Sequence, residues 1–425
     1  MLDRHIRLLG EYFATVEDHR RPNVRFPLNE VLMSGAALFA FKDPSLLAFR
    51  DQYRTRGENL ERVYGIHALP GDTALRDSLD GVDPASLMGA FVHLTEGLRG
   101  GDALAGHRVL GGYLPLSFDA TGQFHSGKIK CPACLTKKHR DGRVSYHHQL
   151  MGAVITAPRQ SRVFPLGCEA ILNGDGSTKN DCELVAGRRL LKRLLEQYDG
   201  ERFLLLFDAL YNNGPHIRRI LEAQQDYLIV NKGDNYVRVQ VDALRRANEL
   251  KGCSIREGAV VHHFEYAADL VLNGANREVS TNYFSCRSVR ISDDEQIFFG
   301  SWITSLPVGP HNLVELMWTA RGRWKIENET FNTLKTKGYN IEHNYGHGKQ
   351  HLATNFAILC FLVFLADQLA EHDSPVFAAA KRASGSYARL WEKVRQLFCI
   401  FQIRCMAKLY QYIADKEEVS KPMLI

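Results

Sequence analysis

The feature that most constrains the fold is a series of short apolar segments between residues 108 and 231, interrupted by two segments of helical period. The apolar segments lie at 114–118, 147–157, 162–167, 202–210 and 226–233. The helical segments lie at 181–198 and 214–224, on either side of the fourth apolar segment. The last two apolar segments are almost continuous, which is typical of strands covered on both faces. This succession predicts an α/β fold with a mixed sheet whose first part is antiparallel.

The rest of the chain has different patterns. Short segments with N-cap carboxylates followed by proline predict a helical N-terminal part. A β-rich insertion is predicted after the last apolar strand, because Val237, Val239 and Val241 alternate there and further strand-like runs follow. Helical patterns return after Pro310. The predicted division of the chain is therefore a helical part at 1–105, a first core part at 106–231 and the β-rich insertion at 232–306. A helix that completes the core follows at 307–349, and a C-terminal helical region at 350–425.

The N-terminal helical part carries a group of basic residues. They are Arg50, Arg54, Arg56 and Arg62. Such a group would suit a small DNA-binding module. A helical packing domain with a solvated basic face explains the same residues equally well.

Composition excludes several classes of protein. With 45% hydrophobic and 24% charged residues among 425, the chain is neither a disordered tail nor a collagen-like fibre nor a disulfide-stapled mini-domain. The net charge of +5 permits a nucleic-acid partner without requiring one. The longest apolar run, 356–366, is shorter than the roughly 20 residues that span a bilayer, so we expect a core helix and no membrane segment. The N-terminus lacks a signal-peptide pattern, and nine cysteines suit a reducing compartment, so a cytoplasmic location is expected.

Three acidic residues occupy positions where a carboxylate costs free energy. Asp119 is expected to end the first strand, and Asp208 follows the apolar run FLLLF at 203–207. On a wheel of about 100° per residue, Glu327 lies on the core-facing side with Trp324 and Phe331. Acids at two strand ends, met by a helical glutamate, can hold two divalent metals. The alternative interpretation makes the two aspartates turn residues and Glu327 an ion-pair partner of Arg323.

These three acids lie in motifs that resemble a known family. The motifs are SFDATG around Asp119, LFDALYNNGPHI around Asp208 and RWKIENETFNTLK around Glu327. Together they resemble the RNase H-like catalytic core of the DDE transposases of bacterial insertion sequences, in the group with a β-rich insertion between the second aspartate and the glutamate. The family often has a tyrosine three residues before the arginine and a lysine seven after the glutamate. This chain has Ala320 and Leu334 there, with Lys335 one place late.

The resemblance implies metal-dependent cleavage of DNA at transposon ends and transfer of the cut strand into target DNA. Two Mg²⁺ or Mn²⁺ ions would be held by Asp119, Asp208 and Glu327. Arg323 and Lys335 would contact DNA phosphates, although surface charges or salt-bridge partners are an equal alternative. The implied partners are double-stranded DNA, as terminal repeats and target, and a second copy of the chain in a homodimer. Competing hypotheses are a nuclease that cuts without joining and a non-enzymatic DNA-binding protein derived from a transposase.

The segment after Asp119 contains a possible zinc hairpin. Cys131 and Cys134, two residues apart, could form a tetrahedral structural Zn²⁺ site with His139 and His147. Free or buried thiols, with His147 and His148 opening a strand, are the alternative. The hairpin is also basic and is expected to bind DNA through Lys128, Lys130, Lys137, Lys138 and Arg140. A zinc-stabilised RNA-processing or adaptor protein would explain this hairpin but not Glu327.

Two histidines follow the glutamate helix in GYNIEHNYGHGKQH. His343 and His347 have a spacing that could bind metal on a helix, but Gly346 and Gly348 favour a loop. We expect contact with the DNA backbone or a structural role there, and no catalytic role.

Overall fold

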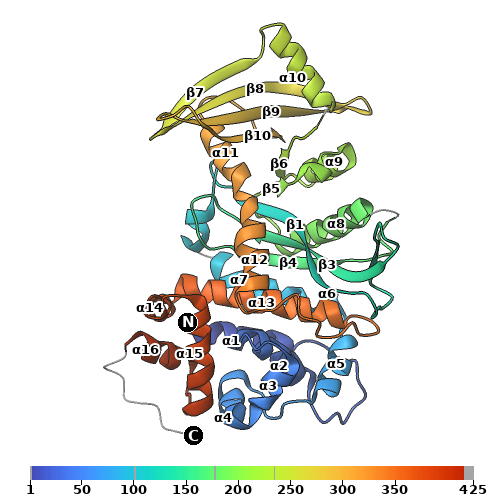
Figure 1. Ribbon diagram of the computed structural model, residues 1–425, viewed down its shortest axis with the longest axis vertical. Helices are drawn as coiled ribbons and strands as arrows, with labels where there is room; N and C mark the ends of the chain where they lie inside the picture. Colours follow the sequence, from blue (N-terminus) through green and yellow to red (C-terminus); the bar gives the residue numbers. More distant parts are fainter. Residues whose placement is uncertain (1, 100–101, 177–178, 234, 416–425) are drawn as a thin grey trace.

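A mixed sheet of ten strands extends from the top of the protein to its middle in the computed structural model (Figure 1), which describes residues 2–99, 102–176, 179–233 and 235–415. The strands of the first core part are β1 (Leu114–Ser126), β2 (Leu135–Lys138), β3 (Val144–Ile155), β4 (Phe164–Ile171), β5 (Phe203–Phe207) and β6 (Asp226–Val230). Those of the insertion are β7 (Lys251–Glu257), β8 (Val260–Asn273), β9 (Asn276–Arg290) and β10 (Gln296–Thr304).

The central five strands have the order β4-β3-β1-β5-β6. The pairs β1/β3 and β3/β4 are antiparallel, whereas β1/β5 and β5/β6 are parallel. The crossover helices are α8 (Lys179–Gln197) and α9 (Gly214–Glu222). Three antiparallel strands followed by two parallel ones confirm the predicted RNase H-like mixed sheet. The short strand β2 pairs with the beginning of β3 and completes a hairpin arm. The sequence pattern did not predict β2 as a strand.

The insertion extends the same sheet. β10 pairs antiparallel with β6, and β9, β8 and β7 follow outward. Its first element is a helix, α10 (Tyr236–Arg246), so the strand predicted from Val237, Val239 and Val241 is wrong. Val237 and Val241 are buried and four apart, which fits one helix face, whereas Val239 is 59% exposed. The Asn235 side chain accepts from the Arg238 N–H at 3.0 Å and caps this helix.

After the insertion the chain returns to the core through a helical rod, shown in orange in Figure 1. It consists of α11 (Leu313–Gly322), the π-helical segment η3 (Ile326–Phe331) and α12 (Asn332–Thr336). Two positions permit the rod to approach the sheet closely. A Cβ on Gly322 would lie 2.8 Å from the Thr156 carbonyl oxygen, and one on Gly152 would lie 3.1 Å from the Phe331 ring. The rod therefore packs against β1 and β3.

The helices of both ends of the chain form the base of the molecule in Figure 1, as predicted for the fold class. The N-terminal helices are α1 (Leu2–Phe13), α2 (Leu28–Ala40), α3 (Leu46–Asp51), α4 (Tyr53–Tyr64), α5 (Asp72–Asp80), α6 (Pro84–Leu87), α7 (Gly89–Arg99) and the 3₁₀ helix η1 (Asp102–His107). The C-terminal ones are α13 (Leu352–Asp373), α14 (Pro375–Ser384), α15 (Tyr387–Ile400) and α16 (Met406–Ala414). The last ten residues of the predicted C-terminal region lie outside the described residues.

Helix α13 is the centre of this base and contacts the sheet through β4. Its length and composition would also permit it to cross a membrane, but 78% of its most apolar window is buried inside the protein. Leu359, Phe361 and Leu365 are among its fully buried side chains. The predicted core helix around 356–366 thus belongs to one hydrophobic core shared by the sheet and both helical regions.

Two of the four N-terminal arginines serve packing between the helical regions. Arg56 is buried; its Nη1 lies 2.6 Å from Asp43 Oδ2 and its Nε lies 3.2 Å from Cys399 Sγ in the C-terminal region. Arg62 donates to the carbonyl of Ile403 at 3.2 Å. Arg50 lies 3.8 Å from Asp72 at the surface, and the side chain of Arg54 lies outside the described residues. Arg56 and Arg62 therefore take part in packing and do not belong to a solvated basic face.

Candidate functional site

Asp119 lies on β1, and Asp208 comes directly after β5, the parallel strand next to β1. Ser117 is level with Leu206, and the rings of Phe118 and Phe207, one residue before each aspartate, stack with their centroids 4.7 Å apart. Asp208 follows β5 directly, as predicted, and its Oδ1 accepts from the Leu210 N–H at 3.0 Å. Asp119 does not end its strand, because β1 continues to Ser126 as one edge of the hairpin arm. Burial, and then the negative charge of Asp119, raise the pKa of Asp208.

Arg323 supplies positive charge to this acidic pair. Its Nη1 lies 2.8 Å from Asp119 Oδ2, with both side chains largely buried. Lys335 Nζ lies 3.1 Å from Glu342 Oε1. Both cations are therefore salt-bridge partners, one of the two predicted alternatives. The pairing of Arg323 with Glu327, which was the alternative to a metal site, is not found; Arg323 bonds to Asp119 instead.

Glu327 is exposed, and the prediction that it faces the core is wrong. Trp324, predicted to share its buried side, is 56% exposed. The cause is the π-helical turn of η3, in which residues five apart share a face. Ile326 and Phe331 therefore form the buried side, and Glu327 to Glu329 face outward. A wheel of about 100° per residue does not apply to such a turn.

Asp119 and Glu327 nevertheless line one cavity of about 360 Å³ between β1 and the rod. Lys335 and Asn332 lie on the same wall, on the α12 side. Asp208 is not part of the lining, and the three carboxylates do not form a tight group. Within the described ranges, the one group of metal-ligating side chains whose donor atoms lie within 4.8 Å of one another is a different one. The roles of the three acids stay a prediction.

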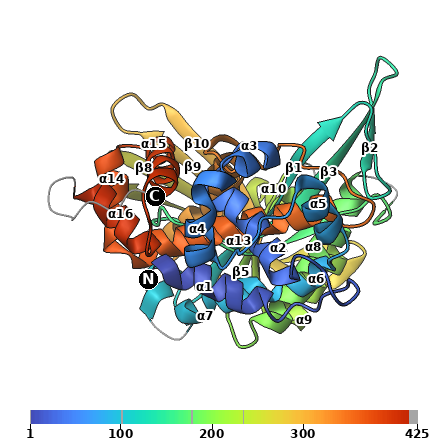
Figure 2. The same ribbon diagram turned by 90° about the horizontal axis from the view of Figure 1, so that it is seen from below.

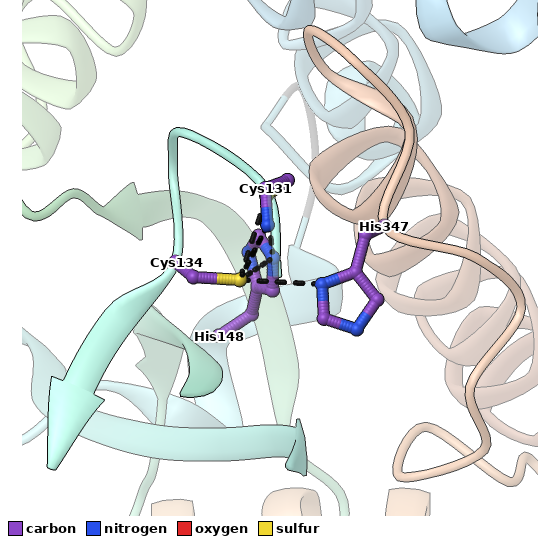
Figure 3. Close-up of side chains that lie close together, drawn as sticks. All are labelled: Cys131, Cys134, His148 and His347. Atoms are coloured by element: carbon purple, nitrogen blue, oxygen red, sulfur yellow. Dashed lines mark hydrogen bonds between the residues drawn. The ribbon is translucent and has the colours of Figure 1, made fainter. Parts of the chain in front are cut away.

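That group consists of Cys131, Cys134, His148 and His347 (Figure 3). The Cys134 Sγ lies 3.5 Å from the Cys131 Sγ, 3.4 Å from His148 Nε2 and 3.2 Å from His347 Nδ1. The Cys131 Sγ lies 3.3 Å from His148 Nε2. Burial raises the pKa of the Cys134 thiol to about 11 and lowers that of the His148 imidazole to about 4. Without a cation, the site thus favours uncharged side chains.

The cluster contains both cysteines of the predicted zinc set and neither of its histidines, His139 and His147. His139 Nε2 lies 2.8 Å from Ser145 Oγ, outside the group. Of the adjacent His147 and His148 on β3, only His148 can face the cysteine turn, because successive strand side chains point to opposite faces. His347, for which we expected a role in DNA contact or structure, completes the group.

The loop that carries His347 is held by a distant carboxylate. Asp80, the last residue of α5, accepts from the backbone N–H groups of Lys349, Gln350, His351 and Leu352 at 2.8 to 3.0 Å. Gly348 lies in the left-handed region, and a Cβ there would meet Asp80 Oδ1 at 2.3 Å. This loop begins after α12, as predicted from its glycines. His343 packs on Tyr345 and does not join the group.

The hairpin arm formed by β1, β2 and β3 projects from the body of the protein (Figure 2). Its five predicted DNA-binding cations, Lys128, Lys130, Lys137, Lys138 and Arg140, are exposed. Asp141, the one acid between 128 and 143, is already bonded to Arg143 at 2.7 Å. The arm therefore carries excess positive charge. At its base lies a cavity of about 770 Å³, whose lining includes Lys137, Lys138 and His148.

The fold and these two groups define a mixed α/β protein with an RNase H-like sheet, an acidic pair and a separate cysteine–histidine cluster. No family model matches the sequence, and neither does any curated protein. Among solved structures, a piggyBac transposase synaptic complex with hairpin DNA is similar, with a TM-score of 0.41 and 10% identity over 97% of this chain and 78% of that chain. A likeness at this level defines neither family nor activity.

Proposed function

We propose that this protein is a DDE-type DNA transposase that cleaves the ends of an insertion sequence and joins them to target DNA. The observation that carries the proposal is the position of Asp119 on β1 and of Asp208 directly after β5, the parallel neighbour of β1, beside a cavity that Asp119 shares with Glu327. Carboxylates on neighbouring strands repel each other unless a cation lies between them. Bound divalent cations would offset this repulsion, so an acidic pair of this kind favours a metal-binding site.

The donor set fits Mg²⁺ or Mn²⁺, because carboxylate oxygens are the hard ligands that these ions prefer. Asp119, Asp208 and Glu327 would hold two such ions. When bound, the ions lower the pKa of an attacking water or 3′-hydroxyl and stabilise the leaving oxygen in an in-line displacement. Arg323 donates to Asp119 and offsets part of its charge.

The cations near the acids would bind the DNA. Arg323 and Lys335 are within side-chain reach of the cavity and would exchange their carboxylate partners for phosphates. The exposed lysines of the arm would contact the backbone farther from the cut, since phosphate contacts position DNA without specifying sequence. Joining two element ends to one target would require a synaptic complex, for which we propose a homodimer in the bacterial cytoplasm.

The test uses a plasmid that carries the gene for this chain with its flanking DNA, together with a supercoiled target plasmid. In Mg²⁺ or Mn²⁺ we expect cuts at the element ends and joined products. Asp119→Asn, Asp208→Asn and Glu327→Gln should each lower cleavage by at least about 100-fold. Glu329→Gln is the matched control, because Glu329 is an equally exposed acid of the same segment outside the cavity lining.

The outcomes separate the competing hypotheses. Cuts without joined products would indicate a nuclease on the same fold. Binding of the flanking DNA without any cut would indicate a non-enzymatic descendant of a transposase. Unchanged cleavage by one acid variant would remove that residue from the site.

A further inference from the structure

We propose that Cys131, Cys134, His148 and His347 bind one Zn²⁺ ion that fastens the hairpin arm to the loop following the glutamate helix. Each residue offers one donor atom, and all four atoms lie within 4.8 Å of one another. The ligands come from three separate segments: the turn before β2, the strand β3 and the loop between α12 and α13 (Figure 3). Two thiolates and two imidazoles form a donor set that selects zinc over Mg²⁺ or Ca²⁺.

The distances fit a small tetrahedral ion. Zinc bonds of about 2.3 Å to sulfur and about 2.0–2.1 Å to nitrogen place neighbouring donors about 3.3 to 3.8 Å apart. The S–S separation of 3.5 Å and the three S–N separations of 3.2 to 3.4 Å are within about 0.4 Å of the values of about 3.8 and 3.6 Å that such a tetrahedron requires. A disulfide between Cys131 and Cys134 is not formed, because their Sγ atoms are 3.5 Å apart rather than about 2.05 Å.

The backbone around the cysteines is shaped for ligation. The Cys131 N–H donates to the Cys134 Sγ at 3.3 Å, and the Cys134 N–H donates to the Cys131 carbonyl at 3.1 Å. The turn thus points both sulfur atoms to one side, and the N–H donor favours the thiolate form of Cys134. Phe124 packs against both His148 and His347 and gives the site an apolar wall.

The position of the site gives the ion a mechanical role. The arm continues from β1, the strand of Asp119, and His347 lies in the loop that leaves the helical rod of Glu327. That loop is itself tied to α5 through Asp80. An ion here would hold the base of the basic arm against the rod and the N-terminal helices. That a fixed arm would help to bind DNA rests on the proposed function, whereas the metal site itself does not.

The first experiment measures metal content in the full-length protein purified without chelator. We expect about one zinc per chain in the wild type, and at least fivefold less in Cys131→Ser and in His347→Gln. His139→Gln is the matched control, since His139 belongs to the same arm and lies outside the group. A wild type without zinc, full zinc in His347→Gln, or loss of zinc in His139→Gln would each overturn the proposal.

A second measurement serves if a cysteine variant does not fold. Wild-type protein, stripped with a chelator and titrated with Co²⁺, should develop the visible absorption of a tetrahedral thiolate site. Zn²⁺ should then abolish that absorption. Removal of zinc should also speed proteolytic cutting between residues 127 and 143 at least fivefold, because the arm loses its tether. Absence of the absorption, or unchanged cutting, would contradict the proposal.

Asp119→Asn separates this inference from the proposed function. The variant should retain its zinc whether or not the wild type cleaves DNA, because Asp119 is not a ligand of the cluster. Zinc retained in the variant, together with a wild type that does not cleave DNA, would leave the metal site standing and remove the transposase. Loss of zinc in Asp119→Asn would contradict the independence of the two sites.

Discussion

The Arg323 guanidinium lies 2.8 Å from the Asp119 carboxylate and joins the helical rod to the central strand across 204 positions of sequence. Asp119 is 25% exposed and Arg323 is 11% exposed, so solvent screens the pair only in part. The charge of Asp119 makes the ionised form of the Asp208 carboxyl group less favourable, and the charge of the same guanidinium offsets part of this effect. A divalent cation binding to this acidic pair must therefore compete with Arg323.

Arg323→Ala is expected to tighten Mn²⁺ binding in the absence of DNA. Removal of the competing positive charge should lower the Kd about fivefold, corresponding to about 1 kcal/mol. Electron paramagnetic resonance of free Mn²⁺, recorded on zinc-loaded protein, measures the change. Lys335→Ala is the control, because Lys335 lines the same cavity but pairs with Glu342. Weaker Mn²⁺ binding by Arg323→Ala would show that the acids do not bind the ion beside Arg323.

Asp208→Asn and Asp119→Asn are expected to change stability in opposite directions in buffer without Mg²⁺ or Mn²⁺. The raised pKa of Asp208 means that the folded state disfavours its carboxylate, so the neutral amide should raise Tm by about 1 to 3 °C. Asp119→Asn breaks the bond to Arg323 and should lower Tm by a similar amount. Calorimetric scans of both variants at pH 7 test this, and shifts of the same sign would contradict it.

Lys138→Gln is expected to weaken binding of duplex DNA about threefold at 0.1 M salt. Loss of one phosphate contact should also reduce the slope of log K against log salt by about 0.9. Arg143→Gln is the control, since Arg143 is already paired with Asp141 on the same arm. Fluorescence anisotropy over a salt series measures both quantities. Equal slopes for the two variants and the wild type would exclude the arm from the interface.

His216 is expected to make the protein sensitive to acid. It is buried against Phe207 and Tyr211, and its two ring nitrogens have no hydrogen-bond partner. Burial, and then the charges of Arg188 and Arg219, lower its pKa to about 3. The unfolded chain takes up a proton below its ordinary pKa of 6.5, whereas the folded protein does not.

The contribution of His216 to stability is therefore present above pH 6.5 and is lost as the pH falls toward 3. Between pH 7 and pH 5 the loss should be about 2 kcal/mol. Urea unfolding at a series of pH values should show a flatter dependence for His216→Leu, and an unchanged one for the exposed His311→Leu. An identical pH dependence in His216→Leu and the wild type would contradict this assignment.

Much of the core was predictable because local patterns and tertiary burial agree there. Leu114, Leu116 and Phe118 alternate on β1, and the continuous run of β5 ends at Asp208, where the chain leaves the sheet. Prediction of secondary structure failed where one hydrophobic pattern is compatible with both a strand and a helix. Val237 and Val241 satisfy both a strand period and one helix face, and the cap at Asn235 was the local signal for the helix.

The sequence by itself determined the order of strands and helices from β3 to β6, the position of Asp208 after its strand and the pair of cysteines, because these depend on residues close together in the chain. Only the tertiary structure decided that a π-helical turn directs Glu327 outward, that Arg323 bonds to Asp119 and that His347 meets Cys134. Contacts between segments more than 200 residues apart depend on how helices pack against a sheet. Hydrophobic periodicity records which side of a segment is buried, but not which distant segment covers it.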